Sequence, residues 1–345
     1  MSRNRLQNPA SAAARFAPLT ARRRTAPKHL AIAAALAVGF AVTGVSADTL
    51  AQPKDEALER TAANYIRFRE DVSAIEAMTF DNANVTREAH RRLAAHDSGE
   101  LSAGWVAYAA LVAADTPEFA DALKKEMKKK KRRNELGGAK GLLSHLAQDP
   151  SYARKLPGAK KAIAAILAMT AHDGARIAAL GEAFKTQAYA MQKTKWGKQR
   201  IAGSQERIKD ASAYRRNRGA ATAPALAHST KGGVIAPSLA SANANWDANW
   251  GEDAPASAMS EKNAQVIMDR VLNLAARYST GTLNATVVSA YAKNNKSDRC
   301  LSMAKLTLDQ CIAATRTPYE EAFCLGEHGL NDIATCVGWV GAPSS

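Results

Sequence analysis

The chain of 345 residues lacks the short motifs that mark common classes of enzyme. It contains no HExxH metalloprotease motif, no GxxxxGK phosphate loop, no GxSxG nucleophile motif and no glycine pattern for dinucleotide binding. Cysteine is scarce as well, because the only four lie between Cys300 and Cys336, without the CxxC spacing of zinc ribbons or redox pairs. These absences favour a non-enzymatic protein and predict neither a cofactor nor a bound metal.

Long apolar runs are also absent, except at residues 30–45 (LAIAAALAVGFAVTGV). This run follows four basic residues between Arg22 and Lys28 and leads to small residues, which is the pattern of a secretory signal. It is shorter than the roughly 20 strongly apolar residues that span a bilayer. We therefore expect a signal peptide at 1–47, cleaved after Ala47, and a periplasmic or extracellular mature protein. An Arg-rich leader without acids also fits a mitochondrial presequence, so the intermembrane space is the alternative.

Positive charge is distributed unevenly along the chain. The formal net charge is +15, from 47 Lys and Arg against 32 Asp and Glu. Residues 1–47 hold seven basic and no acidic side chains, whereas residues 48–203 hold 26 basic and 19 acidic ones, a net charge of +7. Residues 257–345 balance at eight of each. The positive charge of the mature chain is therefore expected mainly on its first part.

Residues 48–203 are predicted to form an all-α, multi-helix bundle. They are rich in Ala, Leu, Lys and Glu, and their apolar residues recur every three or four positions. Residues 101–114 are apolar on all sides, which predicts the buried centre of the bundle. The expected helices cover about 55–77, a segment capped by Asn84, 101–114, a segment starting at Pro117 and ending at Gly137-Gly138, and 159–194.

Residues 204–256 are predicted to be a flexible linker. They begin with an Arg-rich stretch and continue with Ala, Pro, Ser and Gly, with too little periodic apolar sequence to offset chain entropy. Trp246 and Trp250 would share one face of a helix, so they are candidates for docking into a partner's groove or onto the same chain. Residues 257–345 would then form a second helical domain.

The cysteines of this second domain predict two nested disulfides. Cys300 and Cys311 are eleven positions apart, so they project from one side of a helix about 16 Å from each other. Disulfide-bonded residues have Cα atoms about 4.4–6.8 Å apart, so this pair is excluded. A second helix would carry Cys324 and, after a turn at 326–329, Cys336. An antiparallel hairpin pairs Cys311 with Cys324 and Cys300 with Cys336.

The nested pattern resembles the twin-cysteine helical hairpin of mitochondrial intermembrane-space proteins. The resemblance covers residues 300–336, and both cysteine spacings differ from the interval of that family. It implies that the cysteines form a structural crosslink between two helices.

The strongest candidate for a binding surface is a run in which eight of ten residues are basic. So many cations exceed what the end of one helix needs, because like charges on successive turns repel. An exported protein meets anionic lipids and polymers, so we expect contact with an anionic envelope component or a protein partner, with peripheral membrane contact as one form of it and no nucleic-acid binding. The run consists of Lys124, Lys125, Lys128, Lys129, Lys130, Lys131, Arg132 and Arg133.

Three functions from different classes are consistent with the sequence. The first is a non-enzymatic helical interaction or structural protein of the cell envelope. The second is a helical protein that binds a lipid or small ligand between its helices. The third is a peptidoglycan hydrolase with Glu182 or Glu76 as its acid, although no paired carboxylate or motif supports either residue. Two adjacent pairs, His172-Asp173 and Glu327-His328, could orient an imidazole.

Overall fold

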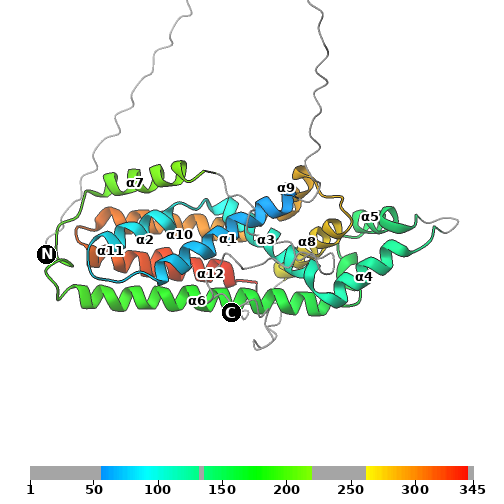
Figure 1. The fold of residues 1–345 in the computed structure, drawn as a ribbon, viewed down its shortest axis with the longest axis horizontal. Coiled ribbons are helices and arrows are strands. Elements are labelled where there is room, and N and C mark those ends of the chain that lie inside the picture. Colours follow the sequence, from blue (N-terminus) through cyan, green and yellow to red (C-terminus); the bar gives the residue numbers. More distant parts are fainter. Residues whose placement is uncertain (1–55, 132–135, 220–261, 341–345) are drawn as a thin grey trace, which may run out of the picture. The chain divides into compact units, whose positions relative to one another are not determined.

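A computed structural model describes residues 56–131, 136–219 and 262–340, and these residues are all-helical, as the sequence predicts (Figure 1). The predicted signal peptide, Arg132, Arg133, Trp246 and Trp250 lie outside the described residues. The helices are α1 (Glu56–Glu76), α2 (Asn84–Ala94), α3 (Ser98–Asp115), α4 (Pro117–Lys128), α5 (Gly138–Gln148), α6 (Ala159–Met191), α7 (Ser204–Asn217), α8 (Lys262–Ser279), α9 (Ala285–Ala292), α10 (Asn295–Ala314), α11 (Pro318–Cys324) and α12 (Asp332–Gly338), with a 3₁₀ turn, η1 (Tyr152–Lys155), and a π-helical turn, η3 (Leu325–Asn331).

Helix α3 is the centre of the core, as its apolar composition predicts. Its side chains are buried almost throughout, and it packs against α1, α6, α8 and α10. It begins three residues earlier than predicted because Asp97 caps it: the Asp97 carboxylate accepts hydrogen bonds from the backbone N–H of Gly99 at 3.0 Å and of Glu100 at 3.1 Å.

The division into two domains differs from what the sequence suggested. One hydrophobic core contains residues from α1 to α6 and from α8 to α12, and α6 packs directly against α11, η3 and α12. A helix that is apolar on every side needs partners on every side, and α8 and α10 supply those partners for α3. The described helices on both sides of the predicted linker therefore share one core.

Helix α7 covers Ser204–Asn217, which lies within the predicted linker. The helix is mostly polar, so composition alone gave no reason to place it in the fold. Polar contacts hold it instead. Asp210 accepts hydrogen bonds from Arg87 at 2.8 Å and from Arg91 at 2.7 and 2.8 Å, both on α2, and Arg207 is buried. The prediction of a linker beginning at residue 204 was therefore wrong for these residues.

Two other predicted helix ends need correction. Asn84 is the first residue of α2 rather than its cap, and its backbone N–H donates to the side chain of Asn82 at 2.8 Å. Helix α4 ends at Lys128 rather than at Gly137-Gly138. The backbone N–H of Gly138 donates to the carbonyl of Lys129 at 2.9 Å, and a φ of 63° at Gly138 suits glycine as the chain turns into α5.

The predicted turn at 326–329 is helical: α11 continues through η3 into α12 without a break. Two glycines allow the close packing of this segment against α6. A Cβ atom at Gly181 would lie 2.1 Å from Asn331 Oδ1, and one at Gly326 would lie 2.6 Å from the carbonyl oxygen of Gly181. Among the described helices, α6 alone is long and apolar enough to cross a membrane by length and composition, but here part of it is buried against η3, α11 and α12.

Candidate functional site

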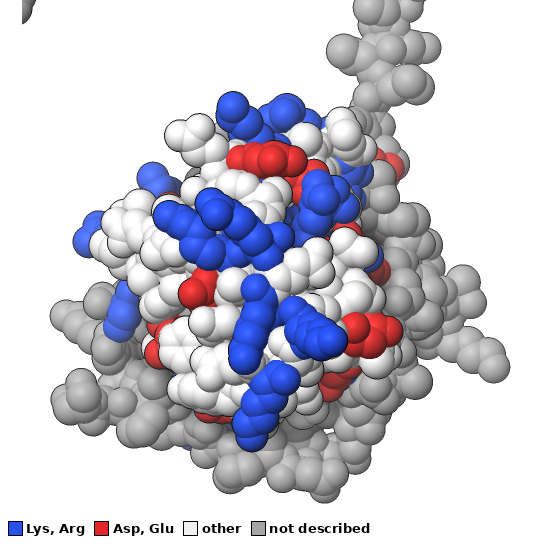
Figure 2. Space-filling view, turned by 90° about the vertical axis from the view of Figure 1, so that its left-hand side faces the viewer, with Lys and Arg blue, Asp and Glu red and all other residues white. Residues whose placement is uncertain are grey.

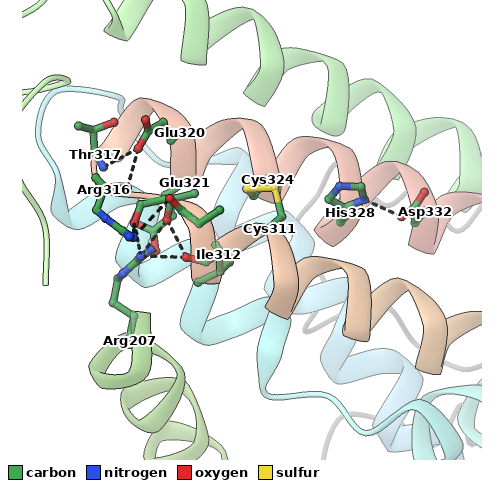
Figure 3. The surroundings of a disulfide bond; sticks show 12 residues. Arg207, Cys311, Ile312, Arg316, Thr317, Glu320, Glu321, Cys324, His328 and Asp332 are labelled. Atoms are coloured by element: carbon green, nitrogen blue, oxygen red, sulfur yellow. Dashed lines mark hydrogen bonds and ion pairs between the residues drawn. A yellow bond between two sulfur atoms is a disulfide. The ribbon is translucent and has the colours of Figure 1, made fainter. Parts of the chain in front are cut away.

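The cysteines form the two nested disulfides that the helix geometry predicts. Cys300 pairs with Cys336 at a Cα separation of 5.5 Å, and Cys311 pairs with Cys324 at 5.6 Å. The first cysteine of each pair lies on α10, and the second on the continuous segment from α11 to α12. Figure 3 shows the inner pair, Cys311 and Cys324. Disulfides are typical of proteins in non-reducing, exported environments, and the crosslinks hold this hairpin closed.

A buried ion pair lies beside the inner disulfide. Arg207 extends from α7 toward the ends of α10 and α11 (Figure 3), and its Nη1 lies 2.9 Å from Glu321 Oε1. Its Nη2 donates to the carbonyl of Ile312 at 3.1 Å and to the hydroxyl of Thr315 at 2.8 Å. Thr86 donates to the other oxygen of Glu321 at 2.8 Å. These contacts within the chain join α2, α7, α10 and α11.

Two buried histidines lie near the same helices. His90 Nδ1 is 3.7 Å from Glu321 Oε1, and His96 Nε2 is 2.7 Å from Asp71 Oδ2. Burial lowers the pKa of His90 and of His96 below the ordinary value of about 6.5, and their acidic neighbours offset this only in part. Both imidazoles are therefore neutral in the folded protein at neutral pH.

These histidines predict that the protein loses stability when the pH falls below about 6.5. A lowered folded-state pKa means that the unfolded chain takes up protons first, so the free energy of unfolding falls as the pH drops below about 6.5. Denaturant unfolding at about pH 7.5 and about pH 5.5 measures this loss. A His90→Asn/His96→Asn variant should lose much less over the same interval; an equal loss would assign the acid sensitivity to other groups.

The predicted basic run is exposed over the part that the structure describes. Lys124, Lys125 and Lys128 lie on α4, and Lys129, Lys130 and Lys131 follow its end. Local ion pairs join Lys124 to Asp121 at 3.4 Å and Lys129 to Glu126 at 2.6 Å. Within the described ranges, no acid forms an ion pair with the four remaining lysines. We refer to Lys125, Lys128, Lys130 and Lys131 as the α4 lysine surface.

The candidate catalytic acids occupy unsuitable environments. Glu182 is exposed; a hydrogen bond from Lys185 and another from Asn331 lower its pKa, whereas a general acid needs a raised pKa. Glu76 forms an ion pair with Arg176. These contacts give the hydrolase hypothesis no support.

The two adjacent histidine pairs differ in the structure. His172 Nδ1 lies 3.7 Å from its neighbour Asp173. His328 instead bonds to Asp332 at 2.9 Å and not to the adjacent Glu327 that the sequence suggested.

Cavities supply a further candidate site. A groove of about 670 Å³ is lined by the apolar side chains of Val266, Ile267, Met303 and Trp339 and by the cations Arg270, Lys296 and Arg299. No acid is among its lining residues. The sequence alone does not indicate this groove, because α8, α10 and the end of α12 contribute to it from three separate segments.

Metal ligands are not gathered anywhere in the described part of the chain: no group of three or more His, Cys, Asp or Glu side chains could hold an ion. All four cysteines form disulfides.

The chain matches no protein-family model, and neither a curated protein nor a solved structure matches it.

Proposed function

We propose that this is a non-enzymatic, exported helical protein that binds an anionic component of the cell envelope through the α4 lysine surface, in the periplasm or outside the cell. The exposed lysines carry the proposal. They lie within one turn of helix and the segment that follows it, and described acids neutralise only two of their neighbours. Such a concentration of one sign of charge attracts anionic polymers and lipid head groups.

The rest of the fold is consistent with a binding role. The described helices form one core that two disulfides reinforce, so the α4 helix is presented from a rigid support. The side chains that could suggest catalysis are internal or already paired with neighbours. A partner recognised by charge would bind reversibly and would be released by salt.

Replacing Lys125, Lys128, Lys130 and Lys131 with Gln should weaken binding to isolated cell envelopes about 30-fold. This follows if each exposed charge contributes about 0.5 kcal/mol, within the range for surface pairs. Co-sedimentation of the full mature chain with envelopes, measured over a series of salt concentrations, gives the affinity. Wild-type binding should fall as salt rises.

A scattered-charge variant controls for net charge. Lys160, Lys209, Arg216 and Lys293 are exposed and distributed over α6, α7 and the end of α9, so replacing all four with Gln removes the same charge. This variant should keep most of the wild-type affinity. Equal losses in the two variants, or binding by the α4 variant equal to that of wild type in low salt, would reject the α4 surface as the contact.

The groove between α8, α10 and the end of α12 supports a second candidate function, binding of a lipid or other small ligand. Its lining combines apolar side chains with cations and contains no acid, which suits an anionic amphiphile. Native mass spectrometry of freshly purified protein would detect a retained ligand, and Met303→Asp should abolish its retention. Ligand kept by this variant would place it elsewhere.

A further inference from the structure

A second cluster of cations accounts for much of the charge in residues 48–203. Lys193, Lys195, Lys198 and Arg200 occur within eight residues that contain no acid. The run at 124–133 contributes eight cations and one acid, so the two clusters together have a net charge of +11. The whole segment has +7, which leaves the remainder at −4. The net positive charge of residues 48–203 thus comes from these two runs.

The second cluster is held in a fixed loop between α6 and α7. The backbone N–H of Ile201 donates to the carbonyl of Arg316 at 3.0 Å, and that of Tyr319 donates to the carbonyl of Gly197 at 3.4 Å. Trp196 packs against the hydrophobic core from within the loop. The four cations are exposed, and none forms an ion pair with a described acid. The loop therefore presents its charges from a defined backbone.

Aromatic side chains lie next to these cations. A pocket of about 420 Å³ opens between the ends of α6, α10 and α11, lined by Tyr189, Gln192, Tyr319 and Phe323 among others. Tyr189 is 59% exposed and Phe323 is 36% exposed, and their ring centroids are 6.3 Å apart. Among the described residues these are the only exposed aromatic side chains.

Charge and aromatic exposure thus meet on one face. Figure 2 views the side of the fold where α6 ends and α11 begins, and Lys and Arg side chains there clearly outnumber Asp and Glu. Glu320, the acid that lines the pocket, is occupied locally: it accepts hydrogen bonds from the backbone N–H of Arg316 and Thr317 at 2.5 and 3.0 Å, as part of the capping box of α11. The end surface is Tyr189, Tyr319, Phe323, Lys193, Lys195, Lys198, Arg200 and Arg316.

We propose that the end surface docks onto an anionic phospholipid bilayer, with Tyr189 and Phe323 entering the interface between head groups and acyl chains. Cations contact the phosphate groups, and exposed aromatic rings are the side chains that favour this interfacial layer. A soluble polyanion would use the cations alone and would leave the exposed rings without a role. The conjunction of rings and unpaired cations is what favours a bilayer.

This inference is independent of the α4 lysine surface. Helix α4 begins beside the start of α6, since a Cβ atom at Gly158 would lie 2.4 Å from the backbone nitrogen of Phe119. The end surface lies at the other end of α6, where Tyr189 is in its last turn and the cations from Lys193 to Arg200 follow it; α6 has 33 residues and is therefore about 50 Å long. The two surfaces can thus be tested separately.

The experiment measures binding of the full mature chain to vesicles of phosphatidylcholine, with and without phosphatidylglycerol. Wild type should bind only the vesicles that contain phosphatidylglycerol. Replacing Lys193, Lys195, Lys198 and Arg200 with Gln should weaken binding more than about 100-fold, because each cation near an anionic surface contributes about fivefold. Arg316 is left intact because it donates to carbonyls at the end of α10.

An aromatic variant separates bilayer docking from simple charge attraction. Tyr189→Gln with Phe323→Gln should weaken vesicle binding at least about tenfold while binding to dextran sulfate stays unchanged. If circular dichroism shows that the double variant is unfolded, Tyr189→Gln alone, at the more exposed position, provides the same test. The scattered-charge variant, which removes the same number of charges away from the end surface, should keep most vesicle binding. Wild-type vesicle binding by either the end-surface charge variant or the aromatic variant would overturn the proposal.

Discussion

Loss of the outer disulfide should lower the free energy of unfolding by about 4 kcal/mol, and loss of the inner one by about 3 kcal/mol. The sequence separations are 36 residues for Cys300–Cys336 and 13 for Cys311–Cys324, and a longer closed loop restricts the unfolded chain more strongly. Urea or guanidinium unfolding of the Cys300→Ser/Cys336→Ser and Cys311→Ser/Cys324→Ser variants measures each loss.

Mass spectrometry of the oxidised protein is the control for pairing. Trypsin together with cleavage after Glu327 separates all four cysteines, so each linked peptide pair identifies one disulfide. Cys300 should be found linked to the Cys336 peptide. A Cys300–Cys324 linkage, or variants as stable as the oxidised wild type, would contradict the role of the nested crosslinks.

Replacing Glu321 with Ala should lower the free energy of unfolding by about 3–5 kcal/mol. The change leaves the Arg207 guanidinium, which is 3% exposed, without its counter-charge, and it removes the nearer of the two acceptors of the Thr86 hydroxyl. Helix α7 should then detach more readily, because Arg207 is one of its main contacts with α10 and α11. Denaturant unfolding gives the total loss, and hydrogen exchange of α7 amides shows whether that helix opens first.

A double variant distinguishes an uncompensated charge from loss of packing. Arg207→Met with Glu321→Leu removes both charges and keeps most of the side-chain volume, so it should recover part of the stability lost by Glu321→Ala. Thr86 is unchanged in both variants. If Glu321→Ala costs less than about 1 kcal/mol, the buried pair does not fasten α7 as described.

Local features predicted most of the helices. Pro117 and Pro318 each occupy the first turn of a helix after a threonine, and the apolar face of α6 repeats over its whole length. The nested disulfides followed from the eleven-residue interval between Cys300 and Cys311 on one helix. Such inferences need only neighbours in sequence, so a single sequence contains them.

The missed features depend on residues far apart in sequence. Arg207 looked like one of many arginines in a polar segment, and its burial depends on Glu321, 114 positions away. In the end surface, Tyr189 and Phe323 are likewise far apart in sequence and meet only in the fold. The sequence by itself shows only the cations between α6 and α7. For the α4 lysine surface, the sequence predicts the concentration of charge. The structure shows that these lysines are exposed and that they have few acidic neighbours.

Contact between the α4 lysine surface and an anionic envelope component is tested most directly by site-specific photo-crosslinking in intact cells. In one variant a photoreactive residue replaces Lys128, and in a second variant it replaces Lys160, an exposed lysine on α6. We expect a crosslinked product with an anionic envelope lipid or polymer from position 128, reduced in high salt, and little product from position 160. No product from position 128 in cells that export the protein, or equal yields from both positions, would contradict it.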